Sequence, residues 1–374
     1  MSMQKLVEMS RRYGSNSAYV LAGGGNTSCK DGGVMRVKGS GTALSTIEEA
    51  QFVAMDMAAL TAMLAKAYPA EDAAREREAL ADMLAARLPG EEEKRPSVEA
   101  ILHALFPYRY VLHTHPALVN GLTCGRDGEA ACRRLFGQSA VWIPLTKPGY
   151  ILAAACKDAF DAARQATGVF PHTVFMANHG LIVAADSVEE IDARMAGIIA
   201  TLGTQVAREP DFSPVEGDTQ KARALSRALI ALYMGEGTAA AVFWSDAQAL
   251  AFVQSADAMA PLMAPFTPDH IVYCKHEPLL VTPEADLPAA FDAYRSKNGF
   301  APKIVAVEGL GLFALGSSGE EARTACALFQ DAMKVAVYTE AFGGPLPLPY
   351  GFTHFILNWE AESYRQKVAA PEAK

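Results

Sequence analysis

The sequence predicts an α/β protein with two domains, on three grounds. The chain has 374 residues, more than the ~250–300 residues over which a single hydrophobic core usually grows. Short apolar segments of strand length alternate with longer segments whose apolar residues recur at helical spacing. Residues 208–218 combine prolines with acidic residues, as linkers do. We therefore expect one domain over 1–207 and a second, smaller α/β domain over 219–374, which ends in a C-terminal tail.

The composition is typical of a globular protein, with 51% apolar and 20% charged residues. The net charge is −9 and no basic patch stands out, which argues against nucleic acid as a partner. Six cysteines are scattered without a Cys-x-x-Cys pair, a pattern that suits a reducing compartment. The N-terminus lacks a signal-peptide pattern and no stretch of about 20 apolar residues occurs. We therefore expect a cytoplasmic protein without a membrane span.

In the first domain, strand-like and helix-like segments follow one another in mixed order. Paired strands are expected within 18–38, because residues 31–33 (Asp-Gly-Gly) have the pattern of a hairpin turn. A capping box that begins at Ser187 starts the last helix of this domain. The helix-like segments are 70–88, 151–166 and 187–206, and the further strand-like segments are 52–55, 110–115, 141–144, 174–177 and 181–183.

The second domain continues with helices near 219–234 and 246–262 and with strands at 240–244, 271–273 and 279–281. Residues 305–316 form two apolar runs around a glycine turn, before a helix start at 317–323. The same order occurs at 175–183 and 187–191, and Leu310 falls where His179 stands. Either a second, metal-free lobe of similar build or the simple recurrence of a strand–helix unit explains this echo.

Three histidines in two short contexts predict a divalent-metal site. His113 and His115 follow the apolar start of a strand, and their spacing of two places both on one face. His179 follows the end of a second apolar strand, and Gly180 permits a tight turn after it. Imidazoles that meet can share an ion at roughly 2.0–2.1 Å, and three protein ligands with an open fourth position are typical of catalytic zinc. The alternative is that these are ordinary core histidines.

A helix start lies just before the His-Thr-His strand. Pro96 suits a first turn and Ser97 suits a cap, which places Glu99 in the first turn. A carboxylate next to three imidazoles can serve as a fourth ligand, as a general base, or as both in turn. The alternative is a first-turn acid that only interacts favourably with the helix dipole.

Two glycine-rich segments, 23–28 and 37–42, flank the predicted hairpin and are expected to lie near each other. Glycines let backbone N–H groups approach an anion, and side chains such as Asn26 and Ser40 add donors. Lys38 adds a positive charge. Neither segment matches the common nucleotide-binding signatures, so an ordinary pair of turns is the alternative.

Together these segments resemble the class II aldolase/adducin family over roughly residues 1–205. Within it they look closest to the aldolase half of bifunctional rhamnulose-1-phosphate aldolase/dehydrogenase proteins. The resemblance rests on the order and spacing of Gly25-Asn26-Thr27-Ser28, Ser40-Gly41, Pro96-Ser97-Val98-Glu99, His113-Thr114-His115 and Asn178-His179-Gly180.

The resemblance implies a central, mainly antiparallel sheet flanked by helices. It implies that Zn²⁺ or another divalent metal binds to His113, His115 and His179, and that Glu99 is the catalytic acid/base. The implied enzyme is a lyase that cleaves or forms a carbon–carbon bond in a sugar phosphate through a metal-stabilised enediolate. The expected substrate- or phosphate-binding residues are Asn26, Lys38, Ser40, Gly41 and Ser97.

Two departures from the family pattern bear on the reaction. Many sugar-phosphate aldolases have two serines before the glutamate, and the second is Val98 here. A tyrosine that is thought to protonate the leaving group is Leu145 here, with Tyr150 nearby but at another position. The alternatives are a decarboxylase or epimerase of the same family, or a non-catalytic scaffold as in the adducin branch. We expect a homo-oligomer whose partner is a small sugar phosphate or a related hydroxy-carbonyl acid.

Overall fold

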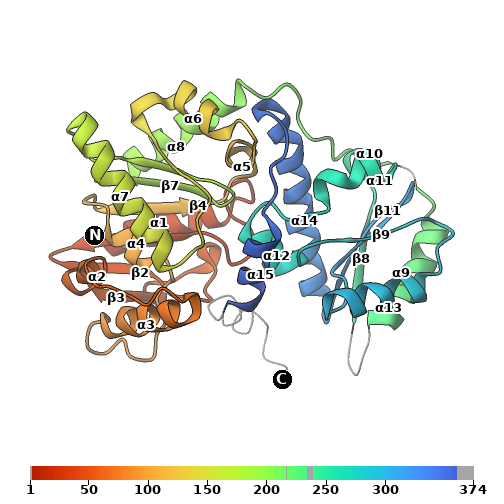
Figure 1. Ribbon diagram of the computed structural model, residues 1–374, viewed down its shortest axis with the longest axis horizontal. Coiled ribbons are helices and arrows are strands. Elements are labelled where there is room, and N and C mark those ends of the chain that lie inside the picture. Colours follow the sequence, from red (N-terminus) through yellow and green to blue (C-terminus); the bar gives the residue numbers. More distant parts are fainter. Residues whose placement is uncertain (1, 216, 234–238, 360–374) are drawn as a thin grey trace. The chain divides into compact units, whose positions relative to one another are not determined.

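The computed structural model describes residues 2–215, 217–233 and 239–359 (Figure 1). The chain folds into two compact units. One contains residues up to 123 together with 127–205, and the other contains 124–126 together with the described residues between 206 and 359. Residue 216 of the expected linker and the expected tail beyond 359 lie outside the described residues.

The first unit is built on a seven-stranded sheet in the order β3-β2-β1-β4-β7-β6-β5. Every neighbouring pair is antiparallel except β5 and β6. The mainly antiparallel sheet implied by the family resemblance is therefore confirmed. The strands are β1 (Asn26–Asp31), β2 (Val34–Lys38), β3 (Phe52–Asp56), β4 (Tyr110–Thr114), β5 (Val141–Ile143), β6 (Thr173–Met176) and β7 (Gly180–Ala185).

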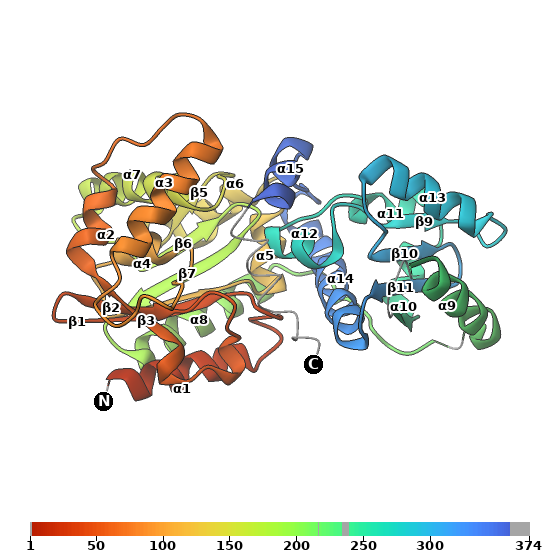
Figure 2. The ribbon, with the colours of Figure 1, turned by 90° about the horizontal axis from the view of Figure 1, so that it is seen from below.

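Helices cover both faces of this sheet (Figure 2). One face carries α1 (Ser2–Gly14) and α8 (Val188–Gly203), and the other carries α2 (Met57–Met63), α3 (Asp72–Ala85), α4 (Ala100–Ala104) and α7 (Tyr150–Thr167). Between β4 and β5 the chain forms α5 (Ala117–Thr123) and α6 (Gly128–Phe136). Buried side chains such as Val53, Val111 and Phe160 form one apolar cluster with α2, α3, α4 and α7, and each contributes about 1.5–3 kcal/mol by burial.

Local signals in the sequence set two of these elements. Gly32 (φ 54°) and Gly33 (φ 84°) form the two-residue turn between β1 and β2, and a turn with two positive φ angles matches the twist of a hairpin. The hairpin predicted at 31–33 is therefore confirmed, although its strands begin at Asn26 and not near residue 18. Ser187 accepts the N–H of Glu190 at 3.2 Å and starts α8 as predicted.

The second unit is smaller and has a four-stranded sheet in the order β8-β11-β10-β9. Its strands are β8 (Ala240–Trp244), β9 (Leu279–Val281), β10 (Ile304–Val307) and β11 (Gly311–Gly316). An apolar cluster that includes Phe291 and Phe313 joins the sheet to α9 (Thr219–Tyr233) and α13 (Leu287–Asn298). The other helices are α10 (Ala247–Phe252), α11 (Ala256–Met259), α12 (Pro268–Cys274), α14 (Gly319–Thr339) and α15 (Tyr350–Asn358). In the described part of either unit, no helix is long and apolar enough to span a bilayer.

Two expectations for the second domain are wrong. Residues 271–273 belong to α12 and not to a strand, because Thr267 accepts the N–H of His270 at 3.4 Å and Pro268 occupies the first turn. These capping signals outweigh a short β-branched run. The single helix expected over 246–262 is divided into α10 and α11, because Ser255 is extended and caps a new helix.

The second sheet repeats the arrangement of half of the first. The order β8-β11-β10-β9 has the same strand directions as β4-β7-β6-β5, with two antiparallel pairs followed by a parallel pair. In both sheets the middle residue of the turn of the central hairpin, Asn178 (53°) or Gly309 (66°), has a positive φ. The next residue is His179 in the first unit and the buried Leu310 in the second.

Candidate functional site

His113 lies near the end of β4, and His115 lies just beyond it. Because β4 is buried along its length between β1 and β7, the imidazole of His113 is only 1% exposed. Its Nδ1 lies 3.0 Å from the carbonyl oxygen of Leu181. A proton on Nδ1 is donated to that carbonyl, which leaves Nε2 as the nitrogen suited to a metal. Nε2 of His115 lies 2.8 Å from Nε2 of His113, so the two imidazoles direct these nitrogens toward the same point.

His179 stands in the turn between β6 and β7. Asn178 takes the left-handed conformation there, which asparagine tolerates better than most residues. The expectation that Gly180 makes the tight turn is therefore wrong. Gly180 is required for space instead, because a Cβ at this position would lie 2.6 Å from the carbonyl oxygen of Thr114 and 2.7 Å from Cδ2 of His115.

The three imidazoles of His113, His115 and His179 fit a metal ion. Their ligand nitrogens lie within 4.8 Å of one another. Two ligands of a tetrahedral zinc ion, each at roughly 2.0–2.1 Å, are about 3.3–3.4 Å apart. The 2.8 Å between His113 and His115 lies below that spacing, so small rotations of the side chains would admit an ion. Neutral imidazoles suit zinc and similar transition metals better than Mg²⁺ or Ca²⁺.

Glu99 faces this cluster. Its Oε2 is 3.4 Å from Nε2 of His113, and its Oε1 is 3.4 Å from Nε2 of His179. Asn26 donates from Nδ2 to Oε2 at 2.5 Å. Glu99 is the N-cap residue of α4, not a residue of its first turn, and Ser97 does not cap the helix but accepts the N–H of Glu99 at 3.3 Å. The helix cap therefore lies two residues later than the sequence predicts.

The environment of Glu99 fixes its ionisation. Burial by itself raises the pKa of this carboxyl, which is 7% exposed. Electrostatic interactions with His113 and His179 and the hydrogen bond from Asn26 outweigh burial and lower the pKa of Glu99 to about 2. Glu99 is therefore a carboxylate at neutral pH, the form that a general base or a metal ligand requires.

Four of the five expected anion-binding residues, Lys38, Ser40, Gly41 and Ser97, lie in or next to two segments that run side by side, and the fifth, Asn26, lies on β1. A β-bridge and two main-chain hydrogen bonds of 2.8 and 2.9 Å join segment 38–40 to segment 95–97. The pairing extends β2 and keeps 95–97 out of the helix. Ser40, which is followed by Gly41, thus lies along the segment that carries Ser97. The pairing uses the backbone N–H groups of Ser40 and Ser97, so the hydroxyls of these two serines are the donors that the arrangement offers to an anion.

Lys38 has a role that the sequence did not predict. It is buried, and its Nζ donates to the carbonyl oxygens of Gly23 and Gly25, both at 3.0 Å. Gly25 has a φ of 63°, and a Cβ there would lie 2.8 Å from the carbonyl oxygen of His113. Lys38 therefore holds the glycine-rich loop against the strand that carries the first two histidines.

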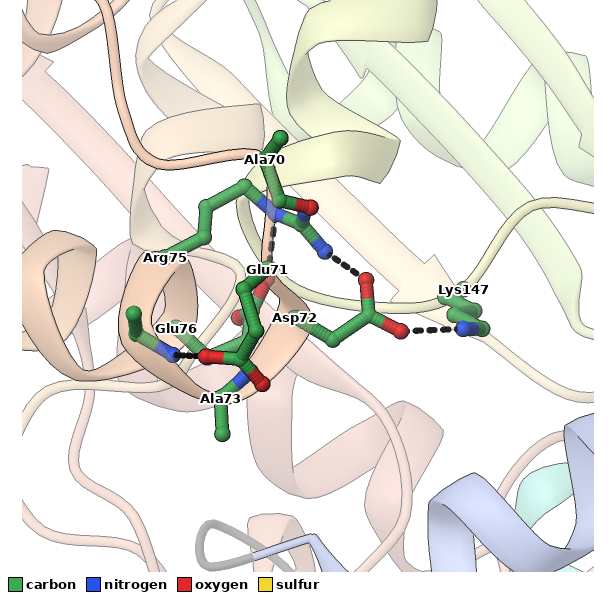
Figure 3. A network of polar contacts seen from close by, with 8 residues as sticks. Ala70, Glu71, Asp72, Ala73, Arg75, Glu76 and Lys147 are labelled. Carbon is green, nitrogen blue, oxygen red and sulfur yellow. Dashed lines mark hydrogen bonds and ion pairs between the residues drawn. The ribbon is translucent and has the colours of Figure 1, made fainter.

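The loop after β5 is fixed by a polar network (Figure 3). Asp72 accepts from both Arg75 and Lys147, and Nε of Arg75 lies 3.5 Å from Glu76. The loop carries Leu145, at the position of the family tyrosine, with 39% of its surface exposed. No hydroxyl is available from this position.

Tyr150 does not take the place of that tyrosine in this structure. It begins α7, and its ring packs against Tyr68 with the centroids 4.5 Å apart. Its hydroxyl donates to the carbonyl oxygen of Lys66 at 3.3 Å. The phenol is therefore held in a contact with the segment after α2.

Two residues beside Glu99 were not singled out from the sequence. Nδ1 of His103 is 2.8 Å from Oγ of Ser28, and both side chains are fully buried. Spacing contained the signal: His103 is four residues after Glu99 on one face of a helix, and Ser28 is two residues after Asn26 on one face of a strand.

Comparison with known proteins identifies relatives. The profile of the Class II Aldolase and Adducin N-terminal domain matches residues 4–206, and that of the Aldolase class II, second domain, matches 218–362. The protein named uncharacterized oxidoreductase YuxG, from Bacillus subtilis (strain 168), is 25% identical over 418 aligned residues that cover 100% of this chain. The chain spans 59% of that relative's length.

Solved structures match slightly more than half of the chain. The N-terminal class II aldolase domain of a conserved protein from Thermoplasma acidophilum is 28% identical, with a TM-score of 0.46, over 54% of this chain and 92% of that one. YgbL from Klebsiella pneumoniae is 18% identical, with a TM-score of 0.38, over 55% and 89%. The first profile covers more than half of the chain and every residue of the site, so the protein belongs to the class II aldolase and adducin family.

Proposed function

We propose that this protein is a zinc-dependent lyase that cleaves or forms a carbon–carbon bond in a sugar phosphate or a related hydroxy-carbonyl acid. The observation that carries the proposal is the buried carboxylate of Glu99, 3.4 Å from two members of a three-imidazole cluster. Burying ionisable groups is costly unless they are paired or bind a metal. A non-catalytic scaffold would gain nothing from this arrangement.

Each part of the site has a chemical role in the proposal. A divalent ion held by His113, His115 and His179 would supply Lewis acidity toward the substrate carbonyl. Glu99 moves the proton of the reacting carbon or hydroxyl, and Asn26 keeps its carboxylate in one orientation by the 2.5 Å hydrogen bond. The donors for the phosphate or carboxylate group of the substrate are Asn26, Ser40, Gly41 and Ser97, within the loop geometry that Lys38 maintains.

Metal content tests the three-histidine site. Protein purified without chelator should contain about one divalent ion per chain, chiefly zinc, by elemental analysis. His179→Ala should lose most of it. His172→Ala is the matched control, because His172 bonds the carbonyl oxygen of Ala184 and is not a member of the cluster. Full occupancy and activity in His179→Ala would remove His179 from the site.

The role of Glu99 is separable from metal binding. Glu99→Gln should keep the metal and slow the chemical step by roughly 10²–10⁴-fold, because the amide cannot carry the proton. Glu76→Gln is a suitable control, because Glu76 is also largely buried but lies on α3 in the network of Figure 3. Nearly normal turnover of Glu99→Gln would contradict the catalytic role and favour the alternative, in which Glu99 only interacts with the helix dipole.

A decarboxylase or epimerase with the same site is the second candidate. Leu145 in place of the family tyrosine, with the hydroxyl of Tyr150 held by Lys66, favours a reaction without that leaving-group acid. A panel of ketose phosphates and hydroxy-acids, with product analysis, separates the candidates. Aldol cleavage gives two carbonyl-containing fragments, decarboxylation gives CO₂, and epimerisation gives a stereoisomer. Light scattering of the same sample tests the expected homo-oligomer.

A further inference from the structure

Two buried polar contacts join β1 to the segment of α4, one at the candidate site and one next to it. The alternate residues Asn26 and Ser28 point from one face of β1, because side chains on a strand repeat every two residues. Asn26 donates to Glu99 at 2.5 Å, and Oγ of Ser28 lies 2.8 Å from Nδ1 of His103. Strand and helix are thus linked at two successive points.

The two links match in spacing. Residues two apart on a strand are separated by about 6.6–6.8 Å, and residues four apart on a helix by about 6 Å along its axis. Asn26 and Ser28 can therefore meet Glu99 and His103 together. The helix α4 has only five residues, and the N–H of His103 donates to the carbonyl oxygen of Glu99 at 3.0 Å. Fixing one end of so short a helix fixes the other.

Packing alone does not explain His103. Its side chain is 0% exposed, and its neighbours Ile101, Leu102 and Ala104 belong to the apolar cluster of the first unit. Its Nε2 is buried and has no hydrogen-bond partner among the described residues. Burial also lowers the pKa of His103 to about 3, so the imidazole is neutral. An apolar side chain at position 103 would fill the space without the cost of burying the unpartnered Nε2.

We propose that His103 is a positioning residue that, through its hydrogen bond to Ser28, sets the rotation of α4 and holds the Glu99 carboxylate against Asn26 and the three histidines. The expected effect on catalysis rests on the proposed function, whereas the expected effect on the position of the Glu99 carboxylate does not. Misplacement of a reacting group by about 1 Å can cost ~10²-fold in rate.

The test compares His103→Leu and Ser28→Ala with the matched control Ser10→Ala. Ser10 forms a buried pair of hydroxyls with Thr27 at 2.7 Å, which links α1 to β1 from the opposite face. His103→Leu and Ser28→Ala should lower kcat by roughly 10–10²-fold with KM changed less than about threefold and metal content unchanged. Ser10→Ala should leave kcat within about twofold. His103→Asn, which can still bond Ser28, should recover most of the loss.

A crystal structure of each variant gives a readout that needs no substrate. In His103→Leu, the distance from Asn26 Nδ2 to Glu99 Oε2 should exceed 3.5 Å, and Ser28→Ala provides the same measurement if the leucine variant does not fold. An unmoved Glu99 overturns the positioning role even if the protein proves not to be a lyase. Equal losses of kcat in the Ser10 and Ser28 variants also overturn it. Absence of metal and turnover in the wild type would refute the proposed function, and the crystallographic comparison would then decide the positioning role alone.

Discussion

Replacing Gly180 with alanine should damage the candidate metal site through space alone. The new Cβ would lie 2.6 Å from the carbonyl oxygen of Thr114, which is fixed by the pairing of β4 with β7, and 2.7 Å from Cδ2 of His115. Both distances are several tenths of an ångström too short. Either the two strands separate or the imidazole of His115 rotates away. Overpacking of this kind costs about 1–3 kcal/mol, and disturbing the support of a metal ligand typically costs ~10–10²-fold in affinity.

The assay combines urea unfolding with competitive zinc titration of the apoprotein. Gly197→Ala is the control, because Gly197 lies inside α8 and its added Cβ would meet no atom within 4 Å. Alanine there should stabilise the protein by about 0.5–1 kcal/mol and leave zinc affinity unchanged. Wild-type zinc affinity and stability in Gly180→Ala would show that β4, β7 and the histidines are looser than these distances indicate.

Two further predictions concern charged groups of the first unit. Burial lowers the pKa of Lys30 from 10.5 to about 7. Between these two pH values Lys30 is protonated in the unfolded chain and largely neutral in the folded chain. The free energy of unfolding should therefore rise with pH from about 7 to 10.5. Lys30→Met should reduce this slope in unfolding experiments between pH 7 and pH 9.5, and parallel curves would contradict the shift. Arg75→Ala should lower the free energy of unfolding by about 3 kcal/mol, because Glu76 loses its buried partner. Arg77→Ala, which removes an exposed arginine from the same helix, should change it by less than about 0.5 kcal/mol.

The sequence was sufficient to place most strands and the histidines of the first unit because their signals are local. Short apolar runs, the two glycines of the hairpin and the spacing of His113 and His115 each act within a few residues. The start of β1 was misplaced, because its segment Asn26–Asp31 is polar. Positions that depend on distant partners were not predictable. Gly180 is small because β4 approaches it, and Lys38 is fixed by carbonyl groups 13 and 15 residues away. No pattern in residues 179–181 or 37–39 alone contains these contacts.

The error at the start of α4 has the same origin. Pro96 and Ser97 have the composition of a helix start, and a single segment offers no reason to reject it. The pairing of segment 95–97 with 38–40 keeps these residues extended, so the helix can begin only at Ala100. In the second unit the opposite happened, because the cap at Thr267 is local and overrode the strand propensity of 271–273. Local capping thus decides a conformation unless a strand pairing competes with it.

A comparison of the two sheets shows whether the fold itself requires a histidine at the turn of the central hairpin. Both contain the same four-stranded arrangement with the same central hairpin, yet the turn position is His179 in one and Leu310 in the other. Leu310 is buried within the apolar cluster of its unit, so this hairpin closes well on an apolar side chain. An imidazole at that position is therefore not required for the turn. The same reasoning applies to Glu99, since a helix N-terminus needs no carboxylate 3.4 Å from two imidazoles. The fold therefore does not account for the imidazoles and the carboxylate of this corner, which is consistent with the binding role that we propose for them.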